Sequence, residues 1–349
     1  MCTAISYKTR DHYFGRNLDL EYSYEERVTI TPRNYVFEFR ECGRMERHYA
    51  MIGMAYVVEG YPLYYDATNE KGLSMAGLLF TGNAQYGEPA EGKDNVAPFE
   101  LIPWVLGQCA DVEEAEELLS KLNLAEIHFS ESLRLTPMHW MLADRERCIV
   151  VEAVADGLQI QENPVGVLTN NPPFAYQMMH LNQYMGLSRK AVQNRFAKGL
   201  ELVPYSRGMG AVGLPGDLSS SSRFVRAAFH KLNAVAGETE VESVNQFFHL
   251  LGSVEMPRGS LEMAGHGVEN GGLDAEIGGR GEEYKEGTEV VSYEITVYSS
   301  CCNTDKGIYY YTTYENRQII GVDMYREDLE GTEVVAYELV KKAEFEMEN

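Results

Sequence analysis

Cys2 is the residue that most directly suggests chemistry in this chain, because it would become the N-terminus once the initiator Met1 is removed. Initiator methionine is removed where the second residue is small, and cysteine qualifies. The mature chain would then carry a thiol and a free α-amine on the same residue. An α-amine has a pKa of about 7.7–8.0 and can serve as the general base for the thiol. A nucleophile of this kind needs no separate histidine to activate it.

Polar residues elsewhere in the chain supply the other parts that such a nucleophile requires. Arg16 and Asp19 lie on or just after the second expected strand. Asn170 follows an apolar strand end, and Arg223 lies near a serine-rich helix start. Read alone, Arg16 and Asp19 predict a local ion pair and Asn170 predicts a turn. Together with an N-terminal cysteine they match the parts of an amide hydrolase, namely a nucleophile, orienting charges and an oxyanion donor.

The remaining motifs do not predict a cofactor or a metal site. The glycine pattern of residues 208–213 matches the dinucleotide-binding fingerprint, but a turn follows it where the fingerprint requires a helix. His139 and Asp144 could belong to a catalytic triad, but no GxSxG sequence accompanies them, so a packed histidine is the better interpretation. The eight histidines are scattered without helical pairing, and we expect no metal and no cofactor.

Composition and charge limit the class of protein and its partners. The chain has 349 residues and a formal net charge of −23, which argues against nucleic-acid binding and against adhesion to an anionic membrane. No apolar run approaches the ~18 residues that span a bilayer, and the N-terminus lacks a signal-peptide core. Six cysteines without a CxxC pair do not predict a disulfide scaffold. We therefore expect reduced thiols, a cytoplasmic location and a small-molecule substrate.

The order of the expected elements predicts an α+β layered protein rather than alternating βαβ units. An N-terminal hairpin over 3–19, turning at 9–11, would hold Cys2 near Arg16 and Asp19. The other expected strands are 29–31, 35–39, 49–58, 73–79, 148–153, 158–161, 292–299, 307–314, 318–324 and 333–340. The expected helices are 99–110, 111–122, 174–200 and 219–235, with Asp111 as the N-cap of the second. Glycine and glutamate crowd residues 259–287, which predicts a long exposed insertion loop.

Several sequence blocks in the same order resemble the choloylglycine hydrolase family, which comprises conjugated bile acid hydrolases and penicillin V acylases within the N-terminal nucleophile hydrolases. The blocks run from residue 1 to about residue 340. They are Met1-Cys2-Thr3, Phe14-Gly15-Arg16-Asn17-Leu18-Asp19, Asn69-Glu70-Lys71-Gly72-Leu73 with Ala76-Gly77-Leu78, Leu168-Thr169-Asn170, Gly213-Leu214-Pro215-Gly216-Asp217, Ser222-Arg223-Phe224, and Gly307-Ile308-Tyr309-Tyr310-Tyr311 through Thr313-Tyr314-Glu315-Asn316. A cysteine at position 2 with these blocks is far more specific than any single motif.

The resemblance implies a single domain over 2–349, folded as a four-layer αββα sandwich and often assembled as a homotetramer. It also implies amide hydrolysis of glycine- or taurine-conjugated bile salts through an acyl-enzyme on Cys2. The implied catalytic residues are Cys2, Arg16, Asp19, Asn170 and Arg223. The two arginines would favour the thiolate of the nucleophile. The side chain of Asn170 and the backbone N–H of Leu79 would form the oxyanion hole.

The substrate remains open at this level, because Leu79 stands where the resemblance implies asparagine in bile salt hydrolases and tyrosine in penicillin V acylases. The alternatives are a penicillin V acylase, an N-acyl-homoserine lactone acylase, and a non-catalytic binding protein on the same scaffold. Apolar and aromatic segments favour a steroid face, although they would also accept a phenoxy group. The expected substrate-binding residues are Leu20, Tyr24, Tyr61, Tyr65, Ile127, Leu135 and Arg207. Arg207 would pair with the sulfonate or carboxylate of the leaving amine.

Overall fold

Two antiparallel sheets pack against each other at the centre of the computed structural model, which describes residues 1–133, 135–263 and 292–348. The six-stranded sheet has the order β14-β1-β2-β17-β18-β19, and the eight-stranded sheet has the order β13-β12-β11-β8-β7-β6-β3-β20. The first set spans, in that order, Val167–Leu168, Cys2–Lys8, His12–Leu20, Ile295–Asn303, Ile308–Thr313 and Ile320–Asp323. The second spans Gly157–Glu162, Cys148–Val154, Met138–Ala143, Ser74–Leu79, Tyr61–Asn69, Met51–Val58, Arg27–Thr31 and Val335–Glu338.

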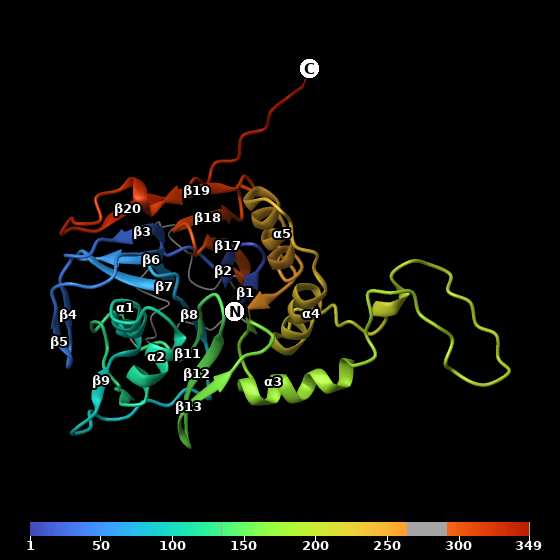
Figure 1. Cartoon of the computed structure of the whole chain (residues 1–349), viewed down its shortest axis with the longest axis horizontal. Helices are drawn as coiled ribbons and strands as arrows, with labels where there is room; N and C mark the ends of the chain where they lie inside the picture. Colours follow the sequence, from blue (N-terminus) through green and yellow to red (C-terminus); the bar gives the residue numbers. More distant parts are fainter. Residues whose placement is uncertain (134, 264–291, 349) are drawn as a thin grey trace, which may run out of the picture.

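Helices cover the outer face of each sheet (Figure 1). On the six-stranded sheet lie α4 (Ser220–Asn233) and α5 (Glu240–Gly252). On the eight-stranded sheet lie α1 (Leu101–Leu106) and α2 (Val112–Leu119), whose apolar side chains share a core with that sheet. The order helix, sheet, sheet, helix confirms the predicted four-layer αββα sandwich. Asp111 caps α2 as predicted, accepting a hydrogen bond from the Glu114 N–H at 2.9 Å.

Short elements complete the fold. A hairpin joins β4 (Phe37–Phe39) to β5 (Gly43–Met45), and β9 (Asp94–Val96) pairs with β10 (Leu122–Leu124) in parallel. The pair β15 and β16 spans Glu262–Met263 and Ser292–Tyr293. Helix α3 (Phe174–His180) follows β14, and 3-10 turns occupy Pro98–Glu100, Leu181–Tyr184, Met209–Ala211 and Met324–Arg326.

The eight-stranded sheet is buried on both faces because its central strands alternate apolar side chains between two cores. In β11, Met141 belongs to the core between the sheets, whereas Trp140 and Leu142 belong to the core beneath α1 and α2. In β8, Leu78 belongs to the core between the sheets and Met75 to the core beneath α1 and α2. Two-sided burial produces a continuous apolar run rather than an alternating one. For this reason periodicity alone does not identify a strand such as β11.

The N-terminal hairpin forms as predicted and carries the candidate site at its open end. Cys2 pairs with Leu18 across β1 and β2, and Asp19 pairs with Thr296 of β17. On its other edge β1 pairs with β14, which ends just before Asn170. Helix α4 packs over β1 and β14. Backbone pairing therefore gathers segments that lie far apart in the sequence.

The structure departs from the predicted elements at several positions. The helix expected over 174–200 ends at His180, and the chain continues as an exposed arm over 185–208 that extends from the body (Figure 1). Strands β7 and β11 and helix α5 occupy segments where no element was predicted. Most of the expected 259–287 insertion lies outside the described residues. Among the described helices, none is long and apolar enough to cross a membrane.

Candidate active site

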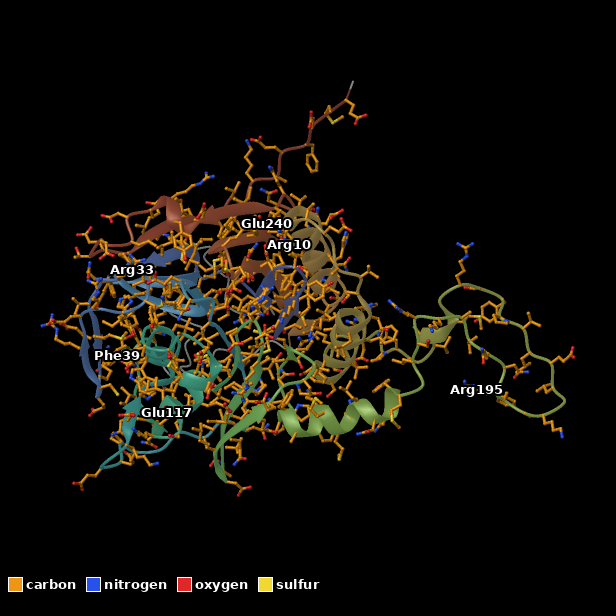
Figure 2. The ribbon with its side chains drawn as sticks, in the orientation of Figure 1. Arg10, Arg33, Phe39, Glu117, Arg195 and Glu240 are labelled. Atoms are coloured by element: carbon orange, nitrogen blue, oxygen red, sulfur yellow. The ribbon has the colours of Figure 1, made fainter. Side chains whose placement is uncertain are left out.

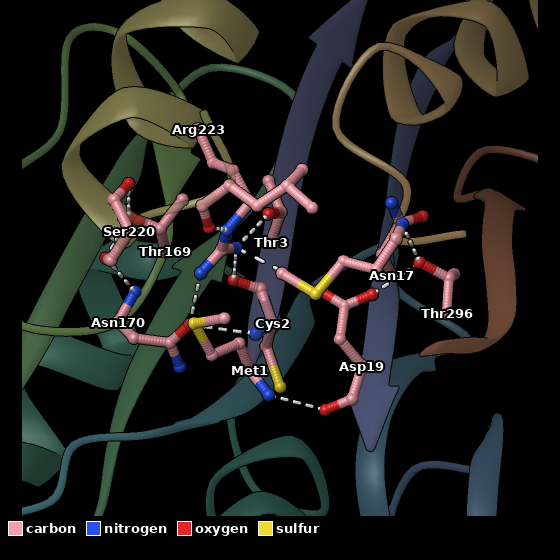
Figure 3. A network of polar contacts seen from close by, with 12 residues as sticks. Met1, Cys2, Thr3, Asn17, Asp19, Thr169, Asn170, Ser220, Arg223 and Thr296 are labelled. Atoms are coloured by element: carbon pink, nitrogen blue, oxygen red, sulfur yellow. Dashed lines mark hydrogen bonds and ion pairs between the residues drawn. The ribbon is translucent and has the colours of Figure 1, made fainter. Parts of the chain in front are cut away.

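A connected network of hydrogen bonds surrounds Cys2 at the start of β1 (Figure 3). The Cys2 N–H donates to Asn170 Oδ1 at 2.8 Å. The guanidinium of Arg223, on α4, donates from Nη1 to the Cys2 carbonyl at 2.5 Å and to Thr3 Oγ1 at 2.6 Å. Its Nη2 donates to Asn170 Oδ1 at 2.8 Å. These contacts fix the backbone on both sides of the thiol and leave the Asn170 amide in one orientation.

Asp19 presents a carboxylate oxygen that is only partly compensated. Its Oδ1 accepts a hydrogen bond from Thr296 Oγ1 at 2.6 Å. Its Oδ2 has no hydrogen-bond partner among the described residues and lies 4.0 Å from Arg223 Nη1. Burial raises the pKa of Asp19, and the positive charge of Arg223 opposes that rise. A fully buried acceptor of this kind is suited to hold an ammonium or amine group.

Arg16, on β2, is fully buried and contributes its charge from the floor of the site. Its Nη1 donates to the Tyr65 carbonyl at 3.0 Å and to the Gly77 carbonyl at 2.5 Å. Its Nη2 has no partner among the described residues, so a donor remains for a bound molecule. The buried carboxylate of Asp66 interacts electrostatically with the positive charge of Arg16. Burial raises the pKa of Asp66, and Arg16 opposes that rise.

Asn170 and Leu79 meet at a single hydrogen bond beside the thiol. Asn170 Nδ2 donates to the Leu79 carbonyl at 2.8 Å, and the Asn170 N–H donates to Ser220 Oγ at 2.8 Å. The neighbouring Phe80 N–H donates to the Pro137 carbonyl at 2.8 Å, toward β11. Backbone groups of successive strand residues point to opposite edges. The N–H of Leu79 therefore points away from β11, on the same side as Asn170.

Met1 occupies the site in the unprocessed chain. Its ammonium donates to the Asp19 carbonyl at 2.5 Å and forms an ion pair with the buried carboxylate of Glu294. The Asp19 N–H donates in turn to the Met1 carbonyl at 2.8 Å. Burial lowers the pKa of the Met1 ammonium. Glu294 and Thr296 carry no sequence signal that marks them as site residues, because only the pairing of β17 with β2 brings them to the site.

An apolar cavity begins at Cys2 and Arg16 and includes Met1. Four of the predicted substrate-binding residues line it, namely Leu20, Tyr24, Tyr65 and Leu135. Leu79 also faces it. The rest of its wall is formed by Leu18, Tyr56, Leu63, Tyr64, Gly77, Pro98, Phe99, Phe129, Leu133, Thr136 and Met138. Aliphatic and aromatic side chains thus dominate the cavity wall.

The model of the linear amide C–N hydrolases of the choloylglycine hydrolase family matches residues 2–270 and 282–337. The chain belongs to the choloylglycine hydrolase family. It is 52% identical over 345 residues to a bile salt hydrolase/transferase of Lactiplantibacillus plantarum, covering 99% of both chains. A bile salt hydrolase/transferase of Clostridium perfringens is 37% identical over 346 residues, covering 98% of both. Like the family, the chain is a hydrolase of linear amide C–N bonds.

Solved structures agree with this membership in the choloylglycine hydrolase family. A crystal structure of a mutant conjugated bile acid hydrolase from Clostridium perfringens superposes with a TM-score of 0.85 at 35% identity, covering 100% of both chains. A penicillin V acylase from Agrobacterium tumefaciens shares the fold, with a TM-score of 0.68 at 20% identity over 98% of this chain and 94% of the other. The family match is interrupted over 271–281, inside the expected insertion.

Three of the predicted substrate-binding residues are not among the described residues that line the cavity. Tyr61 lies one layer behind the wall, with its ring centroid 6.1 Å from that of Phe99 and 5.7 Å from that of Phe129. Ile127 lies in the partly buried segment that leads to Phe129. Arg207 is exposed on the arm that extends from the body. Tyr61 and Ile127 were expected at the cavity because their segments are apolar, and Arg207 because of its positive charge. In the structure Tyr61 packs behind the wall and Arg207 lies on the exposed arm.

The position of Arg207 predicts that its removal leaves discrimination between leaving groups unchanged. Arg207→Ala should keep the ratio of kcat/KM for taurocholate to that for glycocholate within about twofold of wild type, because an exposed guanidinium outside the cavity contributes little. Steady-state kinetics on the two conjugates measures the ratio. A rise in KM for taurocholate alone would instead return Arg207 to the substrate site.

Proposed function

We propose that this enzyme hydrolyses the amide bond of glycine- and taurine-conjugated bile salts and releases the free bile acid and the amino acid. One observation carries the proposal, namely that Cys2 lines an apolar cavity whose other walls are mainly aromatic and aliphatic side chains. A conjugated bile salt has an apolar ring system that ends in an amide and an anionic group. Its rings would fill the cavity and present the amide carbonyl to Cys2. The relatives from Lactiplantibacillus plantarum and Clostridium perfringens are bile salt hydrolase/transferases, which supports the same substrate class.

Acylation begins when the α-amine of mature Cys2 accepts the thiol proton and the thiolate attacks the amide carbonyl carbon. The carbonyl oxygen becomes an oxyanion that accepts hydrogen bonds from Asn170 Nδ2 and the Leu79 N–H. Asp19 Oδ2, unpartnered among the described residues, accepts a hydrogen bond from the α-ammonium and holds it in place. Collapse of the intermediate breaks the C–N bond, and the α-ammonium gives its proton to the leaving amine.

Deacylation repeats the same steps with water as the nucleophile. The α-amine takes a proton from water, the hydroxyl adds to the thioester carbonyl, and the oxyanion returns to the same two donors. Breaking of the C–S bond releases the bile acid, and the α-ammonium returns its proton to the thiolate, which restores the thiol and the free amine. Arg16 and Arg223 stabilise the thiolate as attacking and leaving group. Throughout, Arg223 holds the Cys2 carbonyl at 2.5 Å, so the thiol keeps its position between the two half-reactions.

Parallel assays of glycocholate, taurocholate, penicillin V and an N-acyl-homoserine lactone test the proposal. We expect the two bile salts to be cleaved with the highest kcat/KM. Preferential cleavage of penicillin V or of the lactone would replace the proposed substrate while keeping the chemistry. Mass analysis of the mature N-terminus tests the role of Cys2 separately, because retained Met1 would leave no free thiol and amine pair.

We also propose that the enzyme is a homo-oligomer, with the tetramer as the state that the family resemblance implies. The arm over 185–208 exposes large apolar side chains, including Phe196 at 80% and Tyr205 at 88%. Figure 2 places Arg195 at the far part of this arm, apart from the packed body. Exposed apolar segments of this kind are typical of association surfaces.

The six cysteines are free thiols, which supports a reducing, cytoplasmic location.

Light scattering with Phe196→Asp and Tyr205→Asp combined tests the oligomer. We expect wild type at the mass of the assembly and the double variant at the 39.3 kDa of one chain. Phe345→Asp is the matched control, because Phe345 is 87% exposed on the C-terminal tail rather than on the arm. A monomeric wild type would contradict the proposal.

A further inference from the structure

A buried histidine and glutamate face each other on neighbouring strands behind the candidate active site. His139 lies on β11 and Glu152 on β12, one position beyond the paired residues Trp140 and Val151. His139 Nδ1 and Glu152 Oε1 are 2.9 Å apart, and the two side chains are 0% and 1% exposed. Taking such groups out of water costs free energy unless further hydrogen bonds satisfy them. The remaining partners of the pair show what it holds in place.

Two of the remaining partners belong to the loop that carries Asn170, and the third, Gln161 of β13, donates from Nε2 to Glu152 Oε2 at 3.4 Å. His139 Nε2 donates to the Thr169 carbonyl at 2.8 Å, immediately before Asn170. The Phe174 N–H, at the first residue of α3, donates to Glu152 Oε1 at 3.0 Å. The pair therefore holds the backbone on either side of residues 170–173. A loop tied at both ends has little freedom to move its side-chain donor.

The same imidazole also contacts the segment that carries Leu79. The ring of Phe80, the next residue along the chain, stacks on His139 with centroids 4.2 Å apart and planes inclined by 6°. Phe80 is fully buried, and its N–H is bound to the Pro137 carbonyl at 2.8 Å. One side chain thus contacts both chain segments that supply donors to the oxyanion.

We propose that His139 and Glu152 are positioning residues that fix the distance between the two oxyanion donors, Asn170 Nδ2 and the Leu79 N–H. The inference rests on the proposed function, in which these groups stabilise the tetrahedral intermediate. Each donor acts at about 2.7–3.1 Å from the oxyanion. A small displacement of either segment therefore weakens stabilisation of the transition state. Bound substrate makes much less use of these donors, so the pair acts on kcat rather than on KM.

His139 acts through its neighbours rather than on the substrate. Its side chain is fully buried and is not among the described residues that line the cavity. Asp144, the other residue considered for a triad, accepts hydrogen bonds from the backbone of Val112 and Arg147 instead. A role as general acid or base is therefore not available to His139. The alternative is a contribution to folding alone, and the experiment must separate the two.

His139→Phe tests the pair, because phenylalanine keeps a ring to stack on Phe80 but cannot donate to Thr169. We expect kcat for glycocholate, corrected for the folded fraction, to fall by about tenfold or more while KM stays within about threefold. Iodoacetamide alkylation of Cys2 needs no oxyanion hole, so its rate should stay within about twofold of wild type. In an Asn170→Ala background the same substitution should have a much smaller effect on kcat, because the two changes act on one interaction.

His12→Phe is the matched control for stability. His12 is also buried, with Nε2 2.9 Å from Ser6 Oγ and Nδ1 2.9 Å from Thr304 Oγ1, but it lies at the opposite end of the hairpin from Cys2. This variant should be destabilised and yet retain the kcat of wild type per folded molecule. Glu152→Gln keeps an acceptor for the Phe174 N–H and should stay within about threefold of wild type, whereas Glu152→Ala should behave like His139→Phe.

The outcomes separate this inference from the proposed function. If wild type hydrolyses glycocholate and folded His139→Phe has the same kcat, the positioning role alone is overturned. A loss of the same size in His12→Phe, or equal effects of His139→Phe with and without Asn170, would also overturn it. Failure of wild type to cleave either conjugate would overturn the proposed function and the inference together.

Discussion

Cys2→Ala should abolish amide hydrolysis, lowering kcat/KM for glycocholate by about four orders of magnitude or more, because no other group of the site can form the acyl-enzyme. Cys2→Ser should retain little activity, since the α-amine must then activate an alcohol rather than a thiol. The fold should persist, because the Cys2 backbone is held by β-sheet pairing and by Arg223 rather than by the thiol. Steady-state kinetics and a thermal unfolding curve measure the two effects.

The other cysteines provide the controls. Burial raises the pKa of Cys42 to about 11 and the pKa of Cys148 to about 12. It likewise raises the pKa of Cys109 and of Cys302 to about 12. These thiols are therefore protonated at neutral pH, and iodoacetamide should label Cys2 first. Cys148→Ala should keep wild-type activity, and full activity in Cys2→Ala would end the assignment of the nucleophile.

The fold could be predicted where local pattern and tertiary packing agree. The hairpin of β1 and β2 follows from two strand-like runs around a polar turn, and α2 begins at its predicted cap. The expected helix over 174–200 fails after His180, because the arm that follows has no core against which to pack, and short helices are marginal without packing. The sequence of helix α5 does contain a start signal, the capping box of Thr239 and Glu242, which predicts a helix beginning at this position.

Two missed strands have different physical causes. Strand β11 is buried on both faces, so it lacks the alternation that marks a half-buried strand. Strand β7 contains Pro62 near its start, and proline within a run argues against a strand because it cannot donate to the ladder. In β7 the proline lies near one end, where tertiary packing overrides this preference. Both misses concern the sheet that forms one wall of the cavity.

The residues of the candidate site could be grouped from the sequence as the parts of an amide hydrolase, but their individual roles followed only from the family resemblance. Asn170 reaches Cys2 because β14 pairs with β1, and Arg223 reaches it because α4 packs over both strands. These contacts join residues separated by 168 and 221 positions, and no local pattern encodes them. Supporting groups such as Thr296, Glu294 and the His139–Glu152 pair carry no motif at all. Only the three-dimensional contacts around the candidate catalytic side chains identify them.

Asn170→Ala is the second change with a large expected effect. The amide of Asn170 does two things, since Oδ1 accepts from the Cys2 N–H and Arg223 while Nδ2 donates to the Leu79 carbonyl and, in the proposed mechanism, to the oxyanion. Loss of one oxyanion donor costs about 10²–10³ in kcat. We therefore expect a fall of that size in kcat for glycocholate and a KM within about threefold of wild type. Asn170→Asp should be similarly impaired, because it keeps the acceptor but replaces the donor by a second oxygen.

The adjacent residue of the same type is the control for Asn170→Ala. Asn171 Nδ2 donates to the Thr81 carbonyl at 2.6 Å and its Oδ1 accepts from Asn83 Nδ2 at 2.6 Å, so Asn171 supports the same loop without touching Cys2. Asn171→Ala should loosen the loop slightly and keep kcat within about threefold of wild type. If instead both variants lost activity equally, the loop rather than the Asn170 donor would be responsible. If Asn170→Ala raised KM and left kcat intact, the amide would bind the ground state and the oxyanion would have to be stabilised by the Leu79 N–H and other groups.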